Sequence, residues 1–454
     1  MKKATNILRI VWIISILLHA QVVLAWWHIR VLDTACTNAS QLPGEAFSKP
    51  ALAIGDNSTI HITYADLLER KVIYTYNDGR NWHTEIVDPN LGTRHLSIAL
   101  DSSNNPHISY GNKYAQRDGE WHIETVEDDT AVNNFIALDS NDNPHIFTHT
   151  SYSSPHLKYS YKDSSGWQTE ILDYDTWSGS VFSVALDIHD NPHVSYFHSA
   201  KNDDSLNYAY KDSTGWHRET VEELSDWGYI SSPIIALDSS GNPQICYNPY
   251  SQQGRFLKYA HKDSTGWHRD VIEVENVDFD SLSMALDTND NPHICYRSLD
   301  ENDFPALKYA YKDTTGWHTE VIDNSFQYMW DVKAESIILD SNNKPHVTYH
   351  YRRNTFGFAI AGVGLFWDEN VLKYAHKIGL KWQRKVVERN GGFAAIMSLG
   401  IYGVLPLFMT GGSTFDRTAL ALDAMGNPQI IFTDGMMVIS IYIGYSTTTL
   451  KHAY

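Results

Sequence analysis

The stretch from Ser283 to Val321 decides the fold, because close copies of it recur along most of the 454-residue chain. It begins SMALDTNDNPHICY (283–296) and ends LKYAYKDTTGWHTEV (307–321), with a short polar interruption between the two parts. Turn-forming residues fill 287–292 and 312–316, and the segments around them alternate in a β-rich composition. The pattern predicts four short antiparallel strands, named a, b, c and d in chain order, in a unit of roughly fifty residues.

Copies of this unit can be followed along the chain by the acidic residue that closes strand a. These residues are, for units 1 to 8, Asp56, Asp101, Asp139, Asp187, Asp238, Asp287, Asp340 and Asp423. Unit 8 reaches only strand c at Tyr454, and the missing strand d matches the orphan segment WHIRV at 27–31. The sequence therefore predicts an all-β fold: an eight-bladed β-propeller of four-stranded antiparallel blades, closed by the N-terminal strand completing the last blade.

Two turns carry a resemblance to known propellers. The segment TYNDGRNW (75–82) resembles the Asp-box (BNR) turn of the sialidase-like superfamily, and turns such as KDSTGW (211–216) resemble a shortened form of it. The repeat as a whole is similar to a group of secreted bacterial and archaeal propellers with LKYAYKD…GWH units. The resemblance covers nearly all of 26–454 and implies a fold rather than an activity, because its motifs are structural.

Sialidase chemistry is not expected from this resemblance. Sialidases need three arginines on central strands, a Tyr–Glu pair and an acidic general acid, whereas strand a reads x-A-L-D in most units. The chain also lacks an Arg-Ile-Pro motif near its start, and sialidases have six blades. A polysaccharide lyase would need a Tyr or His base and a cation to neutralise a uronate, and residues of these types lie near loop ends. An enzyme is therefore not excluded.

The N-terminal segment and the overall charge indicate where the protein works. A basic start, an apolar run from Ile10 to Leu18 and the segment VLA (23–25) predict a signal peptide over 1–25. The propeller would then occupy 26–454 and be secreted, periplasmic or exposed at the cell surface; an uncleaved membrane anchor is the alternative. The formal net charge of −19 disfavours nucleic acid as a partner.

The repeated histidines and cysteines are predicted to be structural. The histidines open strand b of separate units, so they surround a ring instead of converging on one metal ion. They are His61, His107, His145, His193, His293 and His346, with Gln244 and Gln429 in two further units. We expect hydrogen bonds within each blade, no metal and no cofactor. Cys246 and Cys295 share one strand position and are predicted to be separate core residues, whereas Cys36 is predicted in a loop.

The turns at 139–143 and 287–291 resemble the opening of a calcium-binding loop. Pro144 and Pro292 stand where such a loop has glycine. An Asx-type turn is the favoured interpretation.

Candidate ligand-binding residues are expected on the face where b–c loops and d–a connections emerge. They are Arg94, His95, His149, His198, Arg297, Glu335, His350, Arg352, Arg353 and Arg417. For any single member, ordinary loop polarity is the plainer explanation. No catalytic residue is assigned.

Three apolar insertions lie on the same predicted face, at 351–370, 390–415 and 434–447. The run from Gly391 to Gly412 carries no charge and is long enough to span a bilayer, but strands of one ring flank it, so a single crossing is not expected. Three roles remain open: a small lid or subdomain, a docking surface for a protein partner or a membrane, or an apolar wall over a cleft.

Taken together, these patterns favour a secreted or envelope-associated binding module for a glycan or protein ligand. One alternative is a carbohydrate-active enzyme, a polysaccharide lyase or glycoside hydrolase, with its site in the central cleft. The other is a structural assembly protein that docks through the apolar insertions.

Overall fold

All elements of secondary structure in the described part of the chain are β-strands. The computed structural model describes residues 29–38, 50–55, 59–67, 69–78, 80–91, 95–127, 131–150, 156–174, 182–200, 203–224, 229–230, 233–251, 254–274, 282–325, 329–360, 363–398, 404–411, 418–422, 427–439 and 444–453. Within these ranges no helix combines the length and the apolar character needed to cross a membrane. The predicted signal peptide, 1–25, lies outside them.

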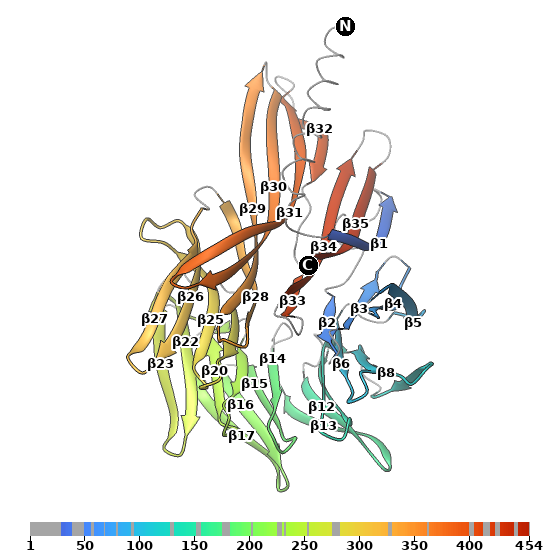
Figure 1. The fold of residues 1–454 in the computed structure, drawn as a ribbon, viewed down its shortest axis with the longest axis vertical. Coiled ribbons are helices and arrows are strands. Elements are labelled where there is room, and N and C mark those ends of the chain that lie inside the picture. Colours follow the sequence, from blue (N-terminus) through green and yellow to red (C-terminus); the bar gives the residue numbers. More distant parts are fainter. Residues whose placement is uncertain are drawn as a thin grey trace.

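Consecutive strands pair antiparallel into separate small sheets, as the repeat predicts (Figure 1). Unit 1 contains β2 (Ala51–Ile54), β3 (Ile60–Asp66), β4 (Lys71–Asn77) and β5 (Trp82–Asp88), and unit 2 contains β6 (Leu96–Leu100), β7 (Pro106–Tyr110), β8 (Lys113–Arg117) and β9 (Trp121–Thr125). Unit 3 contains β10 (Ala131–Leu138), β11 (Pro144–Thr150), β12 (His156–Asp163) and β13 (Gly166–Tyr174), and unit 4 contains β14 (Phe182–Leu186), β15 (Pro192–Ala200), β16 (Asp203–Asp212) and β17 (Gly215–Glu223). Unit 6 contains β24 (Leu282–Leu286), β25 (Pro292–Leu299), β26 (Pro305–Asp313) and β27 (Gly316–Asp323).

Unit 5 adds two short strands to the four of the repeat. Its main strands are β19 (Ile234–Leu237), β20 (Pro243–Tyr247), β22 (Gly254–Asp263) and β23 (Gly266–Val274). The extra strands, β18 (Tyr229–Ile230) and β21 (Pro249–Ser251), extend the sheet from β22. The described sheets are thus consistent with a multi-bladed β-propeller.

Units 7 and 8 share one nine-stranded sheet. Unit 7 contains β28 (Met329–Leu339), β29 (Pro345–Ile360), β30 (Val363–Ile378) and β31 (Lys381–Ser398). Unit 8 contains β33 (Thr418–Leu422), β34 (Pro428–Ile439) and β35 (Gly444–Ala453), and β35 pairs with β1 (Ile29–Asn38). The bridging strand β32 (Val404–Gly411) pairs with β31 on one side and with β34 on the other.

The pairing of β1 with β35 repeats the register of other c–d pairs. In unit 6, Leu307 pairs with Asp323 and Lys308 with Val321, so one residue of strand d is bulged. Between β35 and β1, Leu450 pairs with Asp33 and Lys451 with Val31, with the bulge at the same place. This backbone register places Cys36 opposite Thr447 in a strand, so its predicted loop position is wrong.

The first strand of every unit contacts the first strand of the next around a central axis (Figure 1). The succession runs β2, β6, β10, β14, β19, β24, β28 and β33, and β33 also contacts β2. Apolar side chains fill the space between neighbouring sheets: Leu157 and Tyr159 of unit 3, for example, pack in one cluster with Val184 and Val194 of unit 4. Cys246 and Cys295 are buried and unbonded, as predicted.

A polar triad, here called the outer seam, joins successive sheets. An acid of strand d accepts hydrogen bonds from a cation of strand c and a tryptophan indole in the next unit; between units 3 and 4 these are Glu170, Lys211 and Trp216. The acceptors are Glu85, Glu124, Glu170, Glu219, Asp270 and Glu320. In strand d of units 2 to 6, the tryptophan bonds to the preceding unit and the acid three residues later bonds to the following unit, so both residues join neighbouring sheets.

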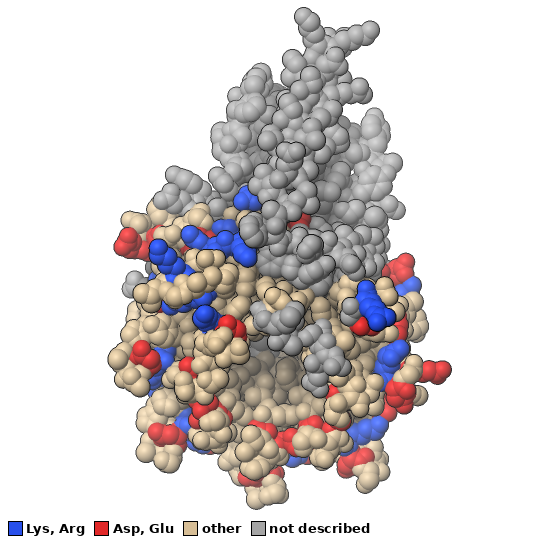
Figure 2. Space-filling view, in the orientation of Figure 1, with Lys and Arg blue, Asp and Glu red and all other residues tan. Residues whose placement is uncertain are grey.

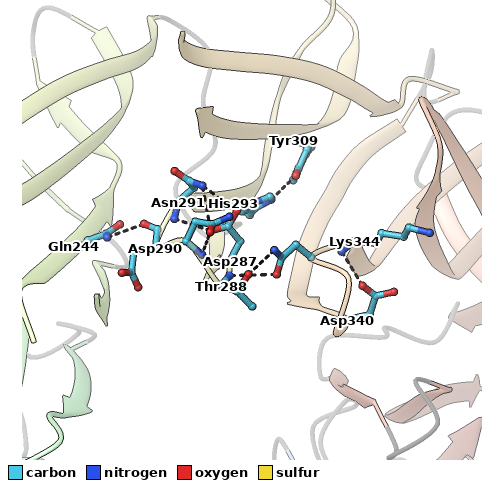
Figure 3. A network of polar contacts seen from close by, with 11 residues as sticks. Gln244, Asp287, Thr288, Asp290, Asn291, His293, Tyr309, Asp340 and Lys344 are labelled. Carbon is cyan, nitrogen blue, oxygen red and sulfur yellow. Dashed lines mark hydrogen bonds and ion pairs between the residues drawn. The ribbon is translucent and has the colours of Figure 1, made fainter. Parts of the chain in front are cut away.

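The a–b turns form a second network that links units 5, 6 and 7 (Figure 3). The Asp287 carboxylate accepts hydrogen bonds from the backbone amides of Asn289 and Asn291, which confirms the Asx-type turn. The Thr288 amide donates to Asn343 of the next unit at 3.2 Å, and Gln244 of the preceding unit donates to the Asp290 carbonyl at 2.9 Å.

The apolar insertions, expected as loops, are largely strands. Residues of the first insertion extend the β29–β30 hairpin to the pair Ile360–Val363, and those of the second continue β31 and form β32. The third extends the β34–β35 hairpin to the pair Ile439–Gly444. The backbones of all three insertions thereby join one sheet, which rises above the other units in Figure 1.

Candidate functional site

The repeated histidines are hydrogen-bonded inside their own units. In unit 4, Nδ1 of His193 lies 2.6 Å from the Tyr208 hydroxyl, and equivalent pairs join His61 to Tyr74 and His107 to Tyr114. Burial lowers the pKa of His61 to about 4 and also lowers the pKa of His107 and His193, which favours the neutral imidazole in each. The predicted hydrogen-bonding role is confirmed. In the part of the chain that is described, no group of His, Cys, Asp and Glu could hold a metal ion.

A cavity of about 440 Å³ is lined by residues in or next to the first strands of five units. Units 1, 2, 3, 7 and 8 contribute to its wall, and the lining residues are Pro50, Ala51, Leu52, His95, Leu96, Asn134, Glu335, Ser336, Leu420 and Ala421. Polar and apolar atoms contribute about equally to the wall, so a ligand would meet hydrogen-bonding groups and aliphatic surface together. Figure 2 shows the hollow among the described residues, with Lys, Arg, Asp and Glu concentrated on the outer parts of the sheets.

A β-bulge presents Glu335 to this cavity. Ala334 pairs with Tyr349 and Ser336 pairs with Thr348, so Glu335 is an extra residue without a partner across the ladder. A bulge twists its strand and re-aims a side chain, and bulges are frequent beside functional sites. The equivalent strand of unit 6 pairs without interruption from Leu282 to Leu286 and has no such residue.

His350 lies beside the Glu335 carboxylate on the neighbouring strand β29. Its Nδ1 lies 3.0 Å from Oε1 of Glu335, and the two side chains are 3% and 9% exposed, respectively. The two groups lie within ion-pair distance, but Nδ1 of His350 is buried and forms no hydrogen bond to the carboxylate or to any other described group. The bulge and the packing against His350 place the Glu335 carboxylate at the cavity wall.

His95 completes the polar part of the cavity. It is exposed just before β6 and lines the same cavity as Glu335 and Ser336, whereas the Asn134 amide hydrogen-bonds to the backbone of Gly111. The carboxylate can accept hydrogen bonds from a polyhydroxylated ligand, and the imidazole and the hydroxyl can form further ones, while Leu52, Leu96 and Leu420 offer apolar surface.

The structure brings two of the predicted candidates, His95 and Glu335, to one cavity and places a third, His350, against Glu335. Among the other candidates with described side chains, none lines the cavity. His149 is buried in β11, and Arg297 belongs to β25 of unit 6. Arg352 and Arg353 lie in β29, and only their backbones are described. Arg94 and Arg417 lie outside the described residues.

His198 has a structural partner away from the cavity. Its Nδ1 lies 3.1 Å from the Asp173 carboxylate of the preceding unit. At this seam Asn207 occupies the position that Lys258 fills in unit 5, where it binds Glu222. His198 thus compensates for a missing lysine.

Two features of the cavity could not be predicted from the sequence, because candidates were chosen by their position near loop ends. Asn134 was not a candidate, because it lies inside β10 and not in a loop. The bulge at Glu335 was also missed, since an extra residue is visible only once the partner strand is placed. The signal that was available is the charged Glu335 itself, directly before SIILD (336–340), where unit 6 has the uncharged Leu282 before SMALD (283–287).

The chain matches no protein-family model and no curated protein. Among solved structures it is similar to an ulvan lyase described as a new polysaccharide lyase family, PL25, with 10% identity, 89% of this chain and 96% of that chain covered, and a TM-score of 0.46. It is also similar to AofleA from Arthrobotrys oligospora (12% identity, 79% and 91% covered, TM-score 0.39) and to the fucose-specific lectin from Aleuria aurantia (14% identity, 60% and 95% covered, TM-score 0.36). At TM-scores below 0.5, these similarities assign no ligand and no activity to the chain.

Proposed function

We propose that the chain is an eight-bladed β-propeller, closed by β1, that binds a neutral glycan in its central cavity. The closure is supported by the contact of β33 with β2 and by the β1–β35 register, which matches that of the c–d pair in unit 6. The glycan site rests on one observation, the bulged Glu335 beside His350 at the wall of the cavity.

The chemistry of the cavity favours a neutral ligand. The described lining contains one carboxylate, Glu335, and neither lysine nor arginine. A uronate would meet this negative charge without a cation to neutralise it, in a chain whose net charge is −19. Sugar hydroxyls can instead donate to the carboxylate and accept from the His95 imidazole.

The same lining favours binding over hydrolysis. Glycoside hydrolases generally use two carboxyl groups, roughly 5–9.5 Å apart, on either side of the scissile bond. The described wall of the cavity supplies only Glu335, and Asn134 and Ser336 cannot replace a second acid. The enzyme alternatives are therefore less well supported than a binding module.

A glycan array followed by calorimetry on the best neutral oligosaccharide tests this function. Glu335→Gln and His95→Ala should each weaken binding about tenfold or more, the loss expected for one hydrogen bond to a buried charged group or for a lining side chain. Glu120→Gln, at an exposed turn remote from the cavity lining, should leave the affinity unchanged. Unchanged affinity in both cavity variants, or turnover of the oligosaccharide, would overturn the proposal.

We also propose that the protein is secreted and that its signal peptide is cleaved after residue 25. The 75–82 turn is proposed to be related to the Asp box. Export in a bacterial host followed by N-terminal sequencing should give a mature chain beginning at Trp26. A retained N-terminus would instead favour the membrane-anchored alternative. The apolar insertions retain their three proposed roles: lid, docking surface or wall.

A further inference from the structure

Each unit except unit 2 carries an extra aromatic ring on strand c, among the units whose strand c side chains are described. The ring stacks on the tyrosine two residues earlier: in unit 6, Tyr311 lies 5.5 Å from Tyr309 and 4.9 Å from His318, centroid to centroid. The equivalents are Tyr76, Tyr161, Tyr210, His261 and His376, with stacking distances of 5.3–5.7 Å. Unit 2 has Gln116 at this position.

A cation from the next unit normally covers this ring. Lys211 lies 4.7 Å from the centroid of Tyr161, and Lys377 lies 5.5 Å from that of Tyr311. The equivalent cation over Gln116 is Lys162, which binds Glu124 and has only the Trp167 ring nearby among the described residues. Between units 2 and 3, the stack that elsewhere consists of aromatic rings and a cation therefore lacks the ring at position 116.

The missing ring leaves its neighbours more exposed than their counterparts. The Lys162 side chain is 39% exposed, whereas the equivalent lysines are 14–31% exposed. The His122 side chain is 59% exposed, against 39–44% for the histidines that stack on a ring in other units. Both differences are expected if the volume next to Gln116 is empty.

A polar crevice of about 620 Å³ occupies this place. Tyr114 and Gln116 of unit 2 form one wall, and unit 3 forms the other with residues 141–144 and 162–164. Gln116 accepts a hydrogen bond from the Tyr114 hydroxyl at 3.3 Å, so its amide stays beside the gap without filling a ring's area. The rim carries the Asn141 and Asn143 amides and the Asp163 carboxylate.

We propose that this crevice is a second binding site, for the side chain of a tyrosine or histidine in a partner polypeptide. The chain itself supplies the precedent, because tyrosine or histidine rings fill the equivalent place in other units. The rim amides can bond the backbone that carries the ring, and the Asp142 and Asp163 carboxylates favour a segment with basic flanking residues. The site is separate from the central cavity and does not depend on its ligand.

The test uses the full chain and two small probes, 4-methylphenol and 4-methylimidazole, which reproduce the tyrosine and histidine side chains. Ligand-observed NMR should show saturable binding of at least one probe to the unaltered protein. Gln116→Tyr should weaken that binding about tenfold or more, because the new ring takes the place of the ligand. Gln116→Ala should retain it.

Unit 6 offers a matched control, since Tyr311→Gln should create a second gap and double the number of bound probes. The peptide acetyl-Lys-Tyr-Lys-amide should bind with the same dependence on Gln116, and acetyl-Lys-Ala-Lys-amide should not. Glu335→Gln should change neither result. The proposal is overturned if no probe binds saturably, if Gln116→Tyr binds as the unaltered protein does, or if methyl pyranosides bind at Gln116 in place of the aromatic probes.

Discussion

Single side chains in this molecule are best understood by comparing their copies. Tyr259 of unit 5 donates its hydroxyl hydrogen bond to Gln244 at 2.6 Å, where Tyr208 of unit 4 contacts His193. The sequence alone predicted this role, because a glutamine in the place of a histidine suits a hydrogen bond better than a metal site. The roles proposed for departures from the repeat depend on the neighbouring strands: Glu335 was a candidate from the sequence, but its bulge was not, and Gln116 was not a candidate.

The substitution His193→Gln tests directly whether glutamine can replace histidine in the hydrogen bond to the tyrosine. We expect a loss of unfolding free energy below about 1 kcal/mol, since the amide can replace the bond to Tyr208, whereas His193→Ala should cost about 1–3 kcal/mol by leaving a buried hydroxyl unsatisfied. Urea unfolding monitored by tryptophan fluorescence measures both. Equal losses for the two variants would mean that the hydrogen bond contributes little.

Acid should destabilise the fold through the same histidines. Burial lowers the pKa of His61 to about 4 and also lowers the pKa of His107, His145, His193, His293 and His346. Between the unfolded value of about 6.5 and the lower folded value, only the unfolded chain takes up these protons, so stability is complete above about pH 6.5 and falls as the pH drops toward 4. For His61 the full loss is on the order of 3 kcal/mol.

Urea unfolding at pH 7.5, 6.0 and 4.5 measures this dependence. His193→Gln should reduce the slope of stability against pH by about one proton in the same range. A slope that is flat down to pH 4.5 would show that the imidazoles are protonated in the folded protein.

At the scale of strands and sheets, the seams between units combine exposed and buried charges. Glu320 accepts from Lys377 at the outer seam and is about one-third exposed, while Asp323, three residues later, is 0% exposed and accepts from Lys373. Burial alone would raise the pKa of Asp323, but the charge of Lys373 and hydrogen bonds from Lys373, Ser325 and Tyr349 hold it below its usual value.

The two acids of this seam should differ in their contribution. Asp323→Asn is expected to cost about 3–5 kcal/mol, because Lys373 would lose its buried counter-charge. Glu320→Gln should cost no more than about 1 kcal/mol, since solvent screens that pair. Thermal and urea unfolding compare them, and adding Lys373→Met to Asp323→Asn should recover part of the loss. Equal costs for the two acids would contradict the difference in burial.

The strands of the repeat were predictable, and those of the insertions were not. Turn residues such as those at 287–292 bound each regular strand, and the alternation between the turns shows the period of two. The insertion strands lack that alternation: residues 393–398 read FAAIMS, which fits a buried strand, a helix or a loop. Their structure depends on distant partners, because β32 bridges β31 and β34.

At the scale of the whole molecule, the repeat predicts the architecture but does not predict the cavity. Repetition alone predicts sheets arranged around an axis, whereas the cavity exists only where strands from five units meet. The sequence placed His95, Glu335 and His350 on one face by loop counting, and it could not show that Glu335 turns toward the cavity through a bulge.

Removing β1 tests the proposed closure of the whole fold. A protein that begins at residue 39 should leave the edge of β35 unpaired, and an exposed strand edge promotes association with other chains. We expect a melting temperature that is lower by several degrees and concentration-dependent oligomers in light scattering. A protein that begins at residue 26 is the control, and identical behaviour of the two would contradict the closure.

The nine-stranded sheet has a consequence for how the central cavity can move. Because β32 hydrogen-bonds to both neighbours, units 7 and 8 are coupled through a continuous backbone ladder, whereas the described strands of the other neighbouring units belong to separate sheets. Glu335 and Leu420, which these two units place in the cavity wall, should therefore move together, because one hydrogen-bonded sheet carries both of them. Thermal widening and narrowing of the entrance should come instead from the opposite wall, where His95 lies, and hydrogen exchange at β6 should be faster than at β28.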